Sequence, residues 1–465
     1  MTLALSREIG DFTALKSCDR LSGGANQETY RILIEAESGD RLLCLRRAVG
    51  GSYEAHAPGQ PGLETEALLF QVAAGAGVPE PQIHYVLRRE DGLGPGFLMQ
   101  WLDGETLGAR IARGDAFDEV RGRLAYQCGE LLARIHAIDV DAHELRDRLE
   151  VQDARDLIEQ RWQTYQEYDT PQPMIDYAAR WLLAHVPAPV APCLAHGDFR
   201  NGNLMVTPAH GVVAVLDWEG AHLGDPMRDL GWLCTNSWRF GVTEREVGGF
   251  GALSDLLQGY TDHSGVQVDT ERVRFWIVYG SFYWAIGCLT MAEHYRNGPD
   301  ATVERPAIGR RSSECQIDCA NLLIPGPVAI PDSGEQTVNK DMPTSTELMR
   351  SVRDFLRQEV MSAMGGRNQF LARVASNSMD ILLREADDVA MYRDREEALL
   401  RELLGSTAPF FELKDELCRR LRDNEIDLQD EDLVNYLRFA TLTQALIDQP
   451  RYSGVATALA ASRPN

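Results

Sequence analysis

Hydrophobic and polar residues alternate over residues 17–49, the pattern typical of half-buried β-strands. Residues 21–26 form a polar, glycine-containing turn between the first two strands. Further strands are indicated at residues 83–87 and 97–102, and a helix at about residues 63–74 separates the two groups. We therefore expect an antiparallel sheet with one accompanying helix in the first part of the chain.

The residue pattern in the remainder of the chain predicts helices. Residues 105–323 are mostly helical by pattern, whereas the next twenty residues are rich in proline, glycine and polar residues, as interdomain linkers are. Beyond them Thr344-x-x-Glu347 is a capping-box signature, and apolar residues then recur at helical spacing. The predicted domains are a first lobe (residues 1–103), a second lobe (104–323), a linker (324–343) and a helical domain (344–465).

The charge balance is acidic. Of 465 residues, 44% are hydrophobic and 25% are charged, which is ordinary for globular domains with ample core. The formal net charge is -24, and no run of lysine and arginine stands out. These features argue against nucleic acid or an anionic membrane as a partner. An anionic small molecule would need a local basic patch.

Nine cysteines are scattered along the chain without a C-x-x-C pair. Cys315 and Cys319 are four residues apart on a predicted helix, and without a further ligand cluster nearby they favour buried thiols over a zinc site. Residues 1–12 lack the apolar region of a signal peptide, and we expect a cytoplasmic protein. Residues 275–292 contain no charge, but their tyrosine, glycine and serine content favours a buried core helix over a membrane span.

Residues 196–203 carry polar side chains suited to catalysis. Asp198 is followed five residues later by Asn203, and an apolar strand at residues 212–216 leads to Asp217. Short motifs with glycine and asparagine also occur in ordinary turns. Here the three elements occur in order, and together they are the residue set of a kinase-type phosphoryl-transfer site. Asp198 would receive the proton of an acceptor hydroxyl, and Asn203 and Asp217 would hold Mg2+ ions on the phosphates of ATP.

A glycine turn and a cation on the third strand predict a surface for phosphates. Ser22, Gly23 and Gly24 would let backbone N–H groups approach phosphates closely, although ordinary hairpin turns have the same composition. Arg46 shares a strand face with Cys44, a small residue that leaves room for adenine. The alternative for Arg46 is an exposed residue at a strand end.

Further positions complete the predicted nucleotide site. Glu66 on the following helix is the candidate partner of Arg46, Glu64 is its rival, and a solvated helix carboxylate is the alternative. Near the end of the last strand, the Gln100 carbonyl and the Leu102 N–H are placed to serve the edge of adenine. The alternative is an ordinary buried strand.

Residues 224–230 begin a helix, with Asp225 suited to cap its N-terminus and Asp229 suited to brace the catalytic loop from below. The pattern GxxxxGK[ST] is absent, which excludes a P-loop enzyme, and neither HExxH nor GxSxG occurs.

Five motifs stand in a characteristic order, at residues 22–26, 77–81, 196–204, 216–219 and 224–230. Together they resemble the aminoglycoside phosphotransferase family over about residues 10–320. The resemblance implies an α+β, two-lobed protein-kinase-like fold, with a small antiparallel β N-lobe and a mainly helical C-lobe, followed by a C-terminal all-α domain. It also implies ATP-dependent phosphorylation of a small-molecule hydroxyl, with Asp198 as the base, Asn203 and Asp217 as the metal ligands, and Glu66 as the partner of the phosphate-binding cation.

The pair Phe199-Arg200 after the Asp is most similar to the subgroup related to the kinase domain of fused acyl-CoA dehydrogenases. In that subgroup phosphorylation turns a hydroxyl into a leaving group. Arg46 departs from the protein-kinase pattern, in which lysine is usual; arginine keeps the charge but binds phosphate as a fork. The helical tail resembles a domain of unknown function found near such kinases.

Three hypotheses for the function follow. In the first hypothesis the substrate is a hydroxyacyl-CoA or related catabolic alcohol. In the second hypothesis it is an aminoglycoside, choline or homoserine. The third hypothesis is a catalytically inactive nucleotide-binding regulator. Candidate substrate contacts are Arg200, Trp218, Glu219, His222, Arg228 and Arg239. The arginines and the histidine among them favour an anionic substrate, whereas an acidic pocket would favour an amino-alcohol.

The apolar stripes of the C-terminal helices need partners. They must pack on each other, on the kinase-like part or on a second chain. We expect a small bundle that also makes a homodimer contact.

Overall fold

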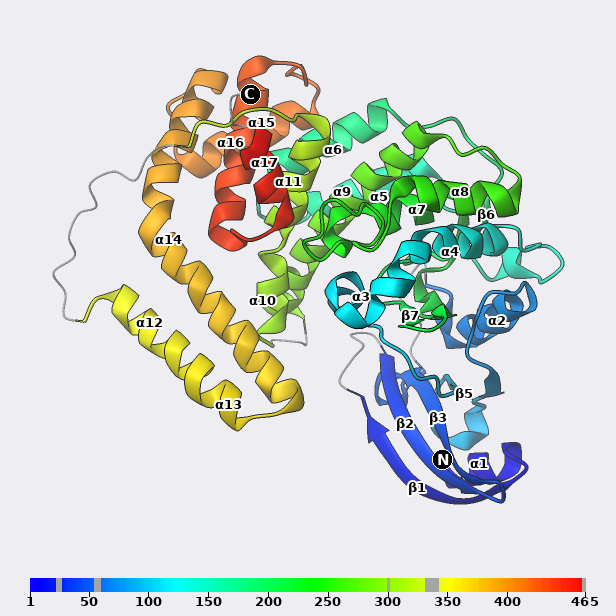
Figure 1. The fold of residues 1–465 in the computed structure, drawn as a ribbon. Coiled ribbons are helices and arrows are strands. Elements are labelled where there is room, and N and C mark those ends of the chain that lie inside the picture. The colour runs from blue at the N-terminus through cyan, green and yellow to red at the C-terminus, as the bar shows by residue number, and fades with distance from the viewer. Residues whose placement is uncertain (22–26, 54–59, 299–301, 331–342, 462–465) are drawn as a thin grey trace. The chain divides into compact units, whose positions relative to one another are not determined.

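The computed structural model describes residues 1–21, 27–53, 60–298, 302–330 and 343–461. It divides into two compact units, each made of two stretches of chain (Figure 1). The first unit comprises Met1–Ala154 and Ala188–Trp276, and the second comprises Arg155–Pro187 and Ile277–Asn465.

The first unit begins with a five-stranded antiparallel sheet. Its strands are β1 (Phe12–Arg20), β2 (Gln27–Ala36), β3 (Gly39–Ala48), β4 (Ile83–Val86) and β5 (Gly96–Gln100), in the order β1-β2-β3-β5-β4. Because β3 is central, Arg46 has a strand on either side, with Thr29 of β2 and Phe97 of β5 as its register partners. The helix between β3 and β4 is α2 (Gly62–Gly75). The predicted antiparallel sheet is confirmed, and so is the helix between its two groups of strands.

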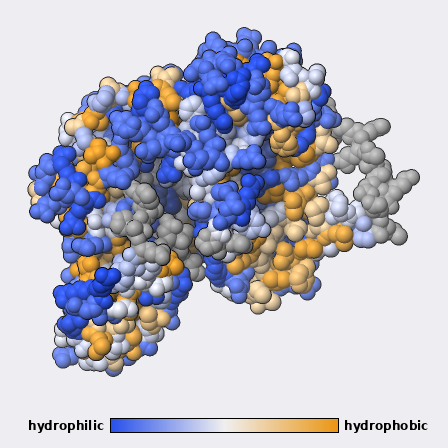
Figure 2. Space-filling model, turned by 180° about the vertical axis from the view of Figure 1, so that it is seen from behind, coloured by the Kyte–Doolittle hydropathy of each residue, from blue (hydrophilic) through white to orange (hydrophobic). Residues whose placement is uncertain are grey.

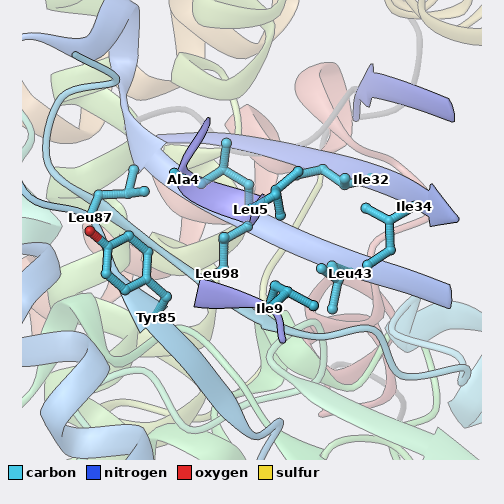
Figure 3. Packing of buried hydrophobic residues seen from close by; sticks show 10 residues of the cluster. Ala4, Leu5, Ile9, Ile32, Ile34, Leu43, Tyr85, Leu87 and Leu98 are labelled. Carbon is cyan, nitrogen blue, oxygen red and sulfur yellow. The ribbon is translucent and has the colours of Figure 1, made fainter. Parts of the chain in front are cut away.

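One face of the sheet is covered by α1 (Thr2–Glu8), an element that the sequence pattern did not indicate. Leu5 from α1 and Ile9 after it pack with Ile32, Leu43 and Leu98 of the sheet (Figure 3). Burying an aliphatic side chain of this size contributes about 1.5–3 kcal/mol relative to leaving it exposed. The apolar face of α1 therefore stabilises the sheet.

The rest of the first unit is mostly helical. Its helices are α3 (Gly108–Arg113), α4 (Asp118–His136), α7 (Met227–Cys234) and α8 (Leu253–Ser264). Two strand pairs accompany them, β6 (Cys193–Ala195) with β9 (His222–Gly224) and β7 (Leu204–Thr207) with β8 (Gly211–Val215). Helices α4 and α8 cross closely, because a Cβ on Gly129 would lie 2.1 Å from the Leu256 carbonyl oxygen.

The second unit is helical throughout its described part. Its helices are α5 (Ala154–Gln166), α6 (Pro173–Ala184), α9 (Thr270–Asn297), α10 (Glu304–Gly309), α11 (Ser312–Leu323), α12 (Ser345–Phe355), α13 (Met361–Ala363), α14 (Gly366–Leu404), α15 (Phe410–Arg422), α16 (Glu431–Asp448) and α17 (Ser453–Ala461). The first residues of α5 and α9 belong to the first unit. The predicted capping box is present, since Thr344 and Glu347 exchange side-chain and backbone hydrogen bonds at the start of α12.

Helix α9 contains the uncharged segment at residues 275–292. It is the one described helix long and apolar enough to cross a membrane, and 61% of its most apolar window is buried inside the protein. Buried core helices can be equally long and apolar, so the length and composition of α9 are weak evidence for a membrane span. All nine cysteines lie in the described part of the chain and are free thiols, and Cys315 and Cys319 are buried.

The two units do not coincide with the predicted domain boundaries (1–103, 104–323, 324–343 and 344–465). Asp176 of α6 is fully buried and accepts hydrogen bonds from Arg422 of α15 at 2.8 and 3.2 Å, so the C-terminal helices share a core with an earlier helix pair. Arg438 of α16 donates to the carbonyl oxygens of Ile324 and Pro325, at 2.6 and 2.7 Å.

The first residues of the predicted linker are thus packed on helices. Val328 and Ile330 lie against the apolar cluster around Leu442. Residues 331–342 lie outside the described residues. The sequence pattern missed this packing because proline and glycine mark a break in regular structure but not a break in the core.

Candidate active site

The backbone of the predicted catalytic loop is held by a buried carboxylate. Asp229, in the first turn of α7, accepts hydrogen bonds from the backbone N–H groups of His196 at 2.7 Å and Gly197 at 2.9 Å. Burial acts to raise the pKa of Asp229, but the hydrogen bond and charge of His136, with its Nε2 3.2 Å away, lower it well below the usual range. Asp229 therefore stays charged and braces the loop from below, as its position in the sequence indicated.

Gly197 permits a close turn at the entry to this loop. Its φ is +81°, and a Cβ there would lie 2.0 Å from the carbonyl oxygen of Gly220. A side chain at this position would both strain the backbone and push the loop away from the segment that follows Asp217.

The Asp198 carboxylate is oriented by three donors. The Asn203 side-chain N–H2 donates to Oδ2 at 2.6 Å, and the Trp232 indole N–H donates to Oδ1 at 2.7 Å. The Arg200 Nε also donates to Oδ1, at 2.9 Å. The side chain of Asp198 is 26% exposed, so it is held firmly yet still reachable from outside.

Asn203 connects Asp198 to the segment that carries Asp217. Its side-chain nitrogen also donates to the Asp198 carbonyl at 3.0 Å, which leaves its side-chain oxygen as the ligand atom for a cation. Its own backbone carbonyl accepts the N–H of Leu216 at 2.8 Å. Asp217 follows in the left-handed region at φ 70°, an uncommon conformation for a residue other than glycine.

Arg46 lies among carboxylates. Its guanidinium donates to Asp217 Oδ1 and to Gln27 Oε1, and its Nε is 3.5 Å from Glu66 Oε2. Glu219 Oε2 is 4.0 Å away. The structure thus brings the predicted phosphate-binding cation, its predicted partner and one predicted metal ligand into one cluster.

The choice between Glu66 and Glu64 is clear in the geometry. The Glu66 side chain is 1% exposed and accepts a hydrogen bond from Gln27 at 2.7 Å. Burial raises its pKa, and the neighbouring Arg46 charge opposes that shift. The Glu64 side chain is 80% exposed, with Arg148 as its ion-pair partner at 3.9 Å. Glu66 is therefore the residue beside Arg46.

The substrate candidates occupy different environments. Trp218 and His222 are fully buried: the Trp218 indole donates to Glu80 at 3.2 Å, and Arg228 donates to His222 Nε2 at 2.8 Å. Arg239 caps the end of α7 through two hydrogen bonds to the Cys234 carbonyl, at 3.1 and 2.7 Å. Arg200 stacks on the Trp238 ring with its Cζ 4.3 Å from the centroid. Their roles toward a substrate, and that of Glu219, stay predictions.

The remaining nucleotide candidates are less closely tied to this cluster. Ser22, Gly23 and Gly24 lie outside the described residues. Gln100 ends β5, with its backbone N–H donating to the Gln82 carbonyl at 2.8 Å, and Leu102 lies beyond the strand that was expected to include it. The adenine contacts stay predictions.

Three supporting residues were not predicted. Gln27 bridges Arg46 and Glu66, Trp232 bonds the Asp198 carboxylate, and Glu80 receives the Trp218 indole. Burial raises the pKa of Glu80 well above its usual value. A signal existed for Trp232 alone, because it lies three residues after Asp229 and so shares its helix face.

The oxygen ligands at Asn203 and Asp217 fit Mg2+, which binds through one or two protein oxygens together with substrate phosphates. Asp217 has the Arg46 guanidinium as its cationic partner in this structure. Within the described residues no group of three or more His, Cys, Asp or Glu side chains is arranged to hold a metal ion. The arrangement therefore suits a metal that arrives with a nucleotide better than a metal held by protein alone.

The sheet, the helical region and this site define a kinase-like phosphotransferase. Residues 17–267 match the model of the phosphotransferase enzyme family, APH, and the chain belongs to that family. Residues 362–452 match a domain of unknown function, DUF6285. The expected family, the kinase-like fold and the helical C-terminal region are confirmed.

Named relatives are similar over part of the chain. Acyl-CoA dehydrogenase family member 10 of Mus musculus is 31% identical over 216 residues, 45% of this chain and 19% of that protein. The protein named "Probable acyl-CoA dehydrogenase IBR3" of Arabidopsis thaliana is 26% identical over 318 residues, 59% of this chain and 37% of that protein. The chain thus spans well under half the length of either relative.

Among solved structures, a candidate aminoglycoside phosphotransferase from Ralstonia eutropha superposes with a TM-score of 0.54 at 21% identity. The match covers 68% of this chain and 94% of that one. At this identity the likeness concerns the fold alone.

Proposed function

We propose that this phosphotransferase moves the γ-phosphoryl group of ATP to a hydroxyl of a small molecule, with Asp198 as the general base. One observation carries the proposal: the Asp198 carboxylate is bonded at 2.6 Å by Asn203, whose side-chain oxygen is thereby left for Mg2+. Asp217 would supply the second protein ligand. Bound Mg2+ would neutralise the charge of the phosphates.

The protein's own residues position the reacting groups and neutralise the charge of the phosphates. Asp198 takes the proton of the acceptor hydroxyl while the acceptor oxygen bonds to the γ-phosphorus, and the bond from that phosphorus to the bridging oxygen breaks to release ADP. Arg46 supplies a buried positive charge for the phosphates, and Glu66 holds it in place. Catalysis of this kind depends on positioning and on fixed charge more than on covalent chemistry.

For the acceptor we propose a hydroxyacyl-CoA or a related catabolic alcohol. The support is that both named relatives are called acyl-CoA dehydrogenases, so the matched region occurs in proteins that carry that name. An aminoglycoside, choline or homoserine is the alternative. A catalytically inactive nucleotide-binding regulator is less favoured, because Asp198, Asn203 and Asp217 are all present in the sequence. We place the protein in the cytoplasm, in keeping with its free thiols.

A coupled ADP-release screen of acyl-CoA derivatives and hydroxylated metabolites tests the proposal. Hits are checked by mass spectrometry for one added phosphoryl group. We expect at least one hydroxyacyl-CoA to stimulate ADP release and to gain a phosphoryl group. Stimulation by aminoglycosides or choline alone would select the alternative acceptor, and nucleotide binding without turnover on any acceptor would favour the regulator.

A further inference from the structure

Trp232 contacts the reacting carboxylate directly, yet it belongs to none of the predicted site positions. Its indole N–H donates to Asp198 Oδ1 at 2.7 Å. Trp232 lies in α7 three residues after Asp229, and side chains at this spacing leave a helix on the same face. One helix face thus fixes the loop backbone at His196 and Gly197 and also the side chain of Asp198.

The indole is fixed by packing. Trp232 is 8% exposed and meets the edge of Trp238 with ring centroids 5.0 Å apart at an interplanar angle of 66°. Trp238 is itself 7% exposed and carries the Arg200 guanidinium on its face. A tryptophan has only two side-chain torsions, so burial between such neighbours leaves its N–H in one direction.

The other donor on Oδ1 is of a different kind. Arg200 is charged, its side chain is 26% exposed, and its long chain can move toward an anion. The indole N–H is neutral, so it orients the carboxylate without cancelling its charge. If Arg200 turns to a phosphate or an anionic acceptor, Trp232 and Asn203 still hold the two oxygens of Asp198.

The hydrogen bonds also indicate which oxygen reacts. A carboxylate oxygen accepts about two hydrogen bonds. Oδ1 already has Trp232 and Arg200, whereas Oδ2 has Asn203 alone among the bonds to described side chains. The second acceptor position of Oδ2 is therefore the place for the hydroxyl proton.

We propose that Trp232 is a positioning residue that turns Oδ2 of Asp198 toward the acceptor hydroxyl. The proposal rests on the proposed function, because it assigns Trp232 an effect on the base of that reaction. Trp232 itself neither gains nor loses a proton. The proton passes from the acceptor hydroxyl to Oδ2 as the new bond to phosphorus forms.

The kinetic test compares Trp232→Phe with Trp162→Phe, using Mg·ATP with water as the acceptor and measuring phosphate release. Trp162 makes the same kind of bond, from its indole to Asp176 at 2.7 Å, in the second unit. We expect Trp232→Phe to lower kcat about ten- to a hundredfold with the KM for ATP within about twofold, since small misplacements of a reacting group have effects of this size. Trp162→Phe should stay within about twofold in both, and Trp232→His, which keeps a ring N–H, should recover part of the loss.

A second measurement needs no variant at Trp232. In protein labelled with 15N-tryptophan, the Trp232 indole resonance should shift upfield in Asp198→Asn, because a neutral amide is a weaker acceptor than a carboxylate. The Trp162 resonance should not move. The proposal would be overturned if the chemical shift of the Trp232 indole were the same in Asp198→Asn and the wild type. A kcat of Trp232→Phe within about twofold of the wild-type kcat would also overturn it.

The failures of the two proposals are distinguishable. If Asp198→Asn is inactive and Trp232→Phe is normal, the positioning role is wrong and the phosphotransferase function stands. If Asp198→Asn turns over like the wild type, Asp198 is not the base, and both proposals are overturned.

Discussion

The Arg46 guanidinium is hydrogen-bonded to Asp217 Oδ1, so the predicted phosphate-binding cation lies on a predicted metal ligand. Glu66 and Glu219 lie within 3.5 and 4.0 Å of the same guanidinium. One positive charge thus faces three carboxylates. The excess negative charge suits a divalent cation, and in this structure the Arg46 guanidinium lies beside Asp217.

This relationship predicts opposite effects on metal and nucleotide binding. In Arg46→Met, Mn2+ alone should bind several-fold more tightly than in the wild type, because Asp217 is released. Mg·ATP should bind at least about tenfold more weakly, because a charge-assisted hydrogen bond to phosphate is lost. Calorimetric titrations with Mn2+ and then with Mg·ATP measure both effects.

The neighbouring carboxylates supply the control. Glu66→Ala should also weaken Mg·ATP binding, since it removes the side chain that holds Arg46. The exposed Glu64, two residues away, should have no effect when changed to Ala. Equal affinities in Arg46→Met and the wild type would contradict this account of the cluster.

The sequence predicted the site best where a local pattern fixes the direction in which a side chain points. Strand alternation placed Arg46 on the face of Cys44, and the motif at residues 196–203 placed Asp198 near Asn203. Trp232 and Glu80 were missed because their partners, Asp198 and Trp218, lie 34 and 138 residues away along the chain, and only tertiary packing brings them together. Arg422 and Asp176 are 246 residues apart, so the sequence pattern did not indicate that they bond each other.

The ion pair between Arg422 and Asp176 predicts a role for the C-terminal helices in stability. Arg422→Ala should lower the free energy of unfolding by about 2–3 kcal/mol, because it leaves a buried carboxylate without its cation. Arg419→Ala, three residues earlier on the exposed side of α15, should change little although it breaks more ion pairs. Urea unfolding of both variants measures the difference, and equal effects would argue that the C-terminal helices are not part of this core.

His222 predicts a loss of stability in acid. Burial, and then the charge of Arg228, lower the pKa of His222 from 6.5 to about 3. The unfolded chain therefore binds a proton between pH 6.5 and 3 that the folded chain does not, and stability rises with pH across this window. At pH 5 the effect is about 2 kcal/mol relative to pH 7.

The matched variant is His222→Gln. Its free energy of unfolding should fall by about 2 kcal/mol less between pH 7 and pH 5 than that of the wild type. An identical pH dependence in the two proteins would mean that His222 is not held neutral in the folded state.

The homodimer expected from the sequence stays a prediction, and α12 offers the surface for testing it. Leu348, Val352 and Phe355 recur at helical spacing there and are 54%, 45% and 51% exposed. Figure 2 shows hydrophobic side chains gathered over α12 and α14. We expect a dimer mass by light scattering, and a single-chain mass for Phe355→Glu but not for Phe411→Glu on α15. A single-chain mass for the wild type would contradict the predicted homodimer.

The central claim is that Asp198 is the base of a phosphoryl transfer, and one comparison tests it most directly. Asp198→Asn should bind Mg·ATP with unchanged affinity, because the predicted metal ligands Asn203 and Asp217 and the Arg46 charge remain. With the acceptor that the ADP-release screen identifies, its rate of phosphoryl transfer should be about two to four orders of magnitude below that of the wild type, the usual effect of losing a general base. Turnover near the wild-type rate in this variant would contradict the account.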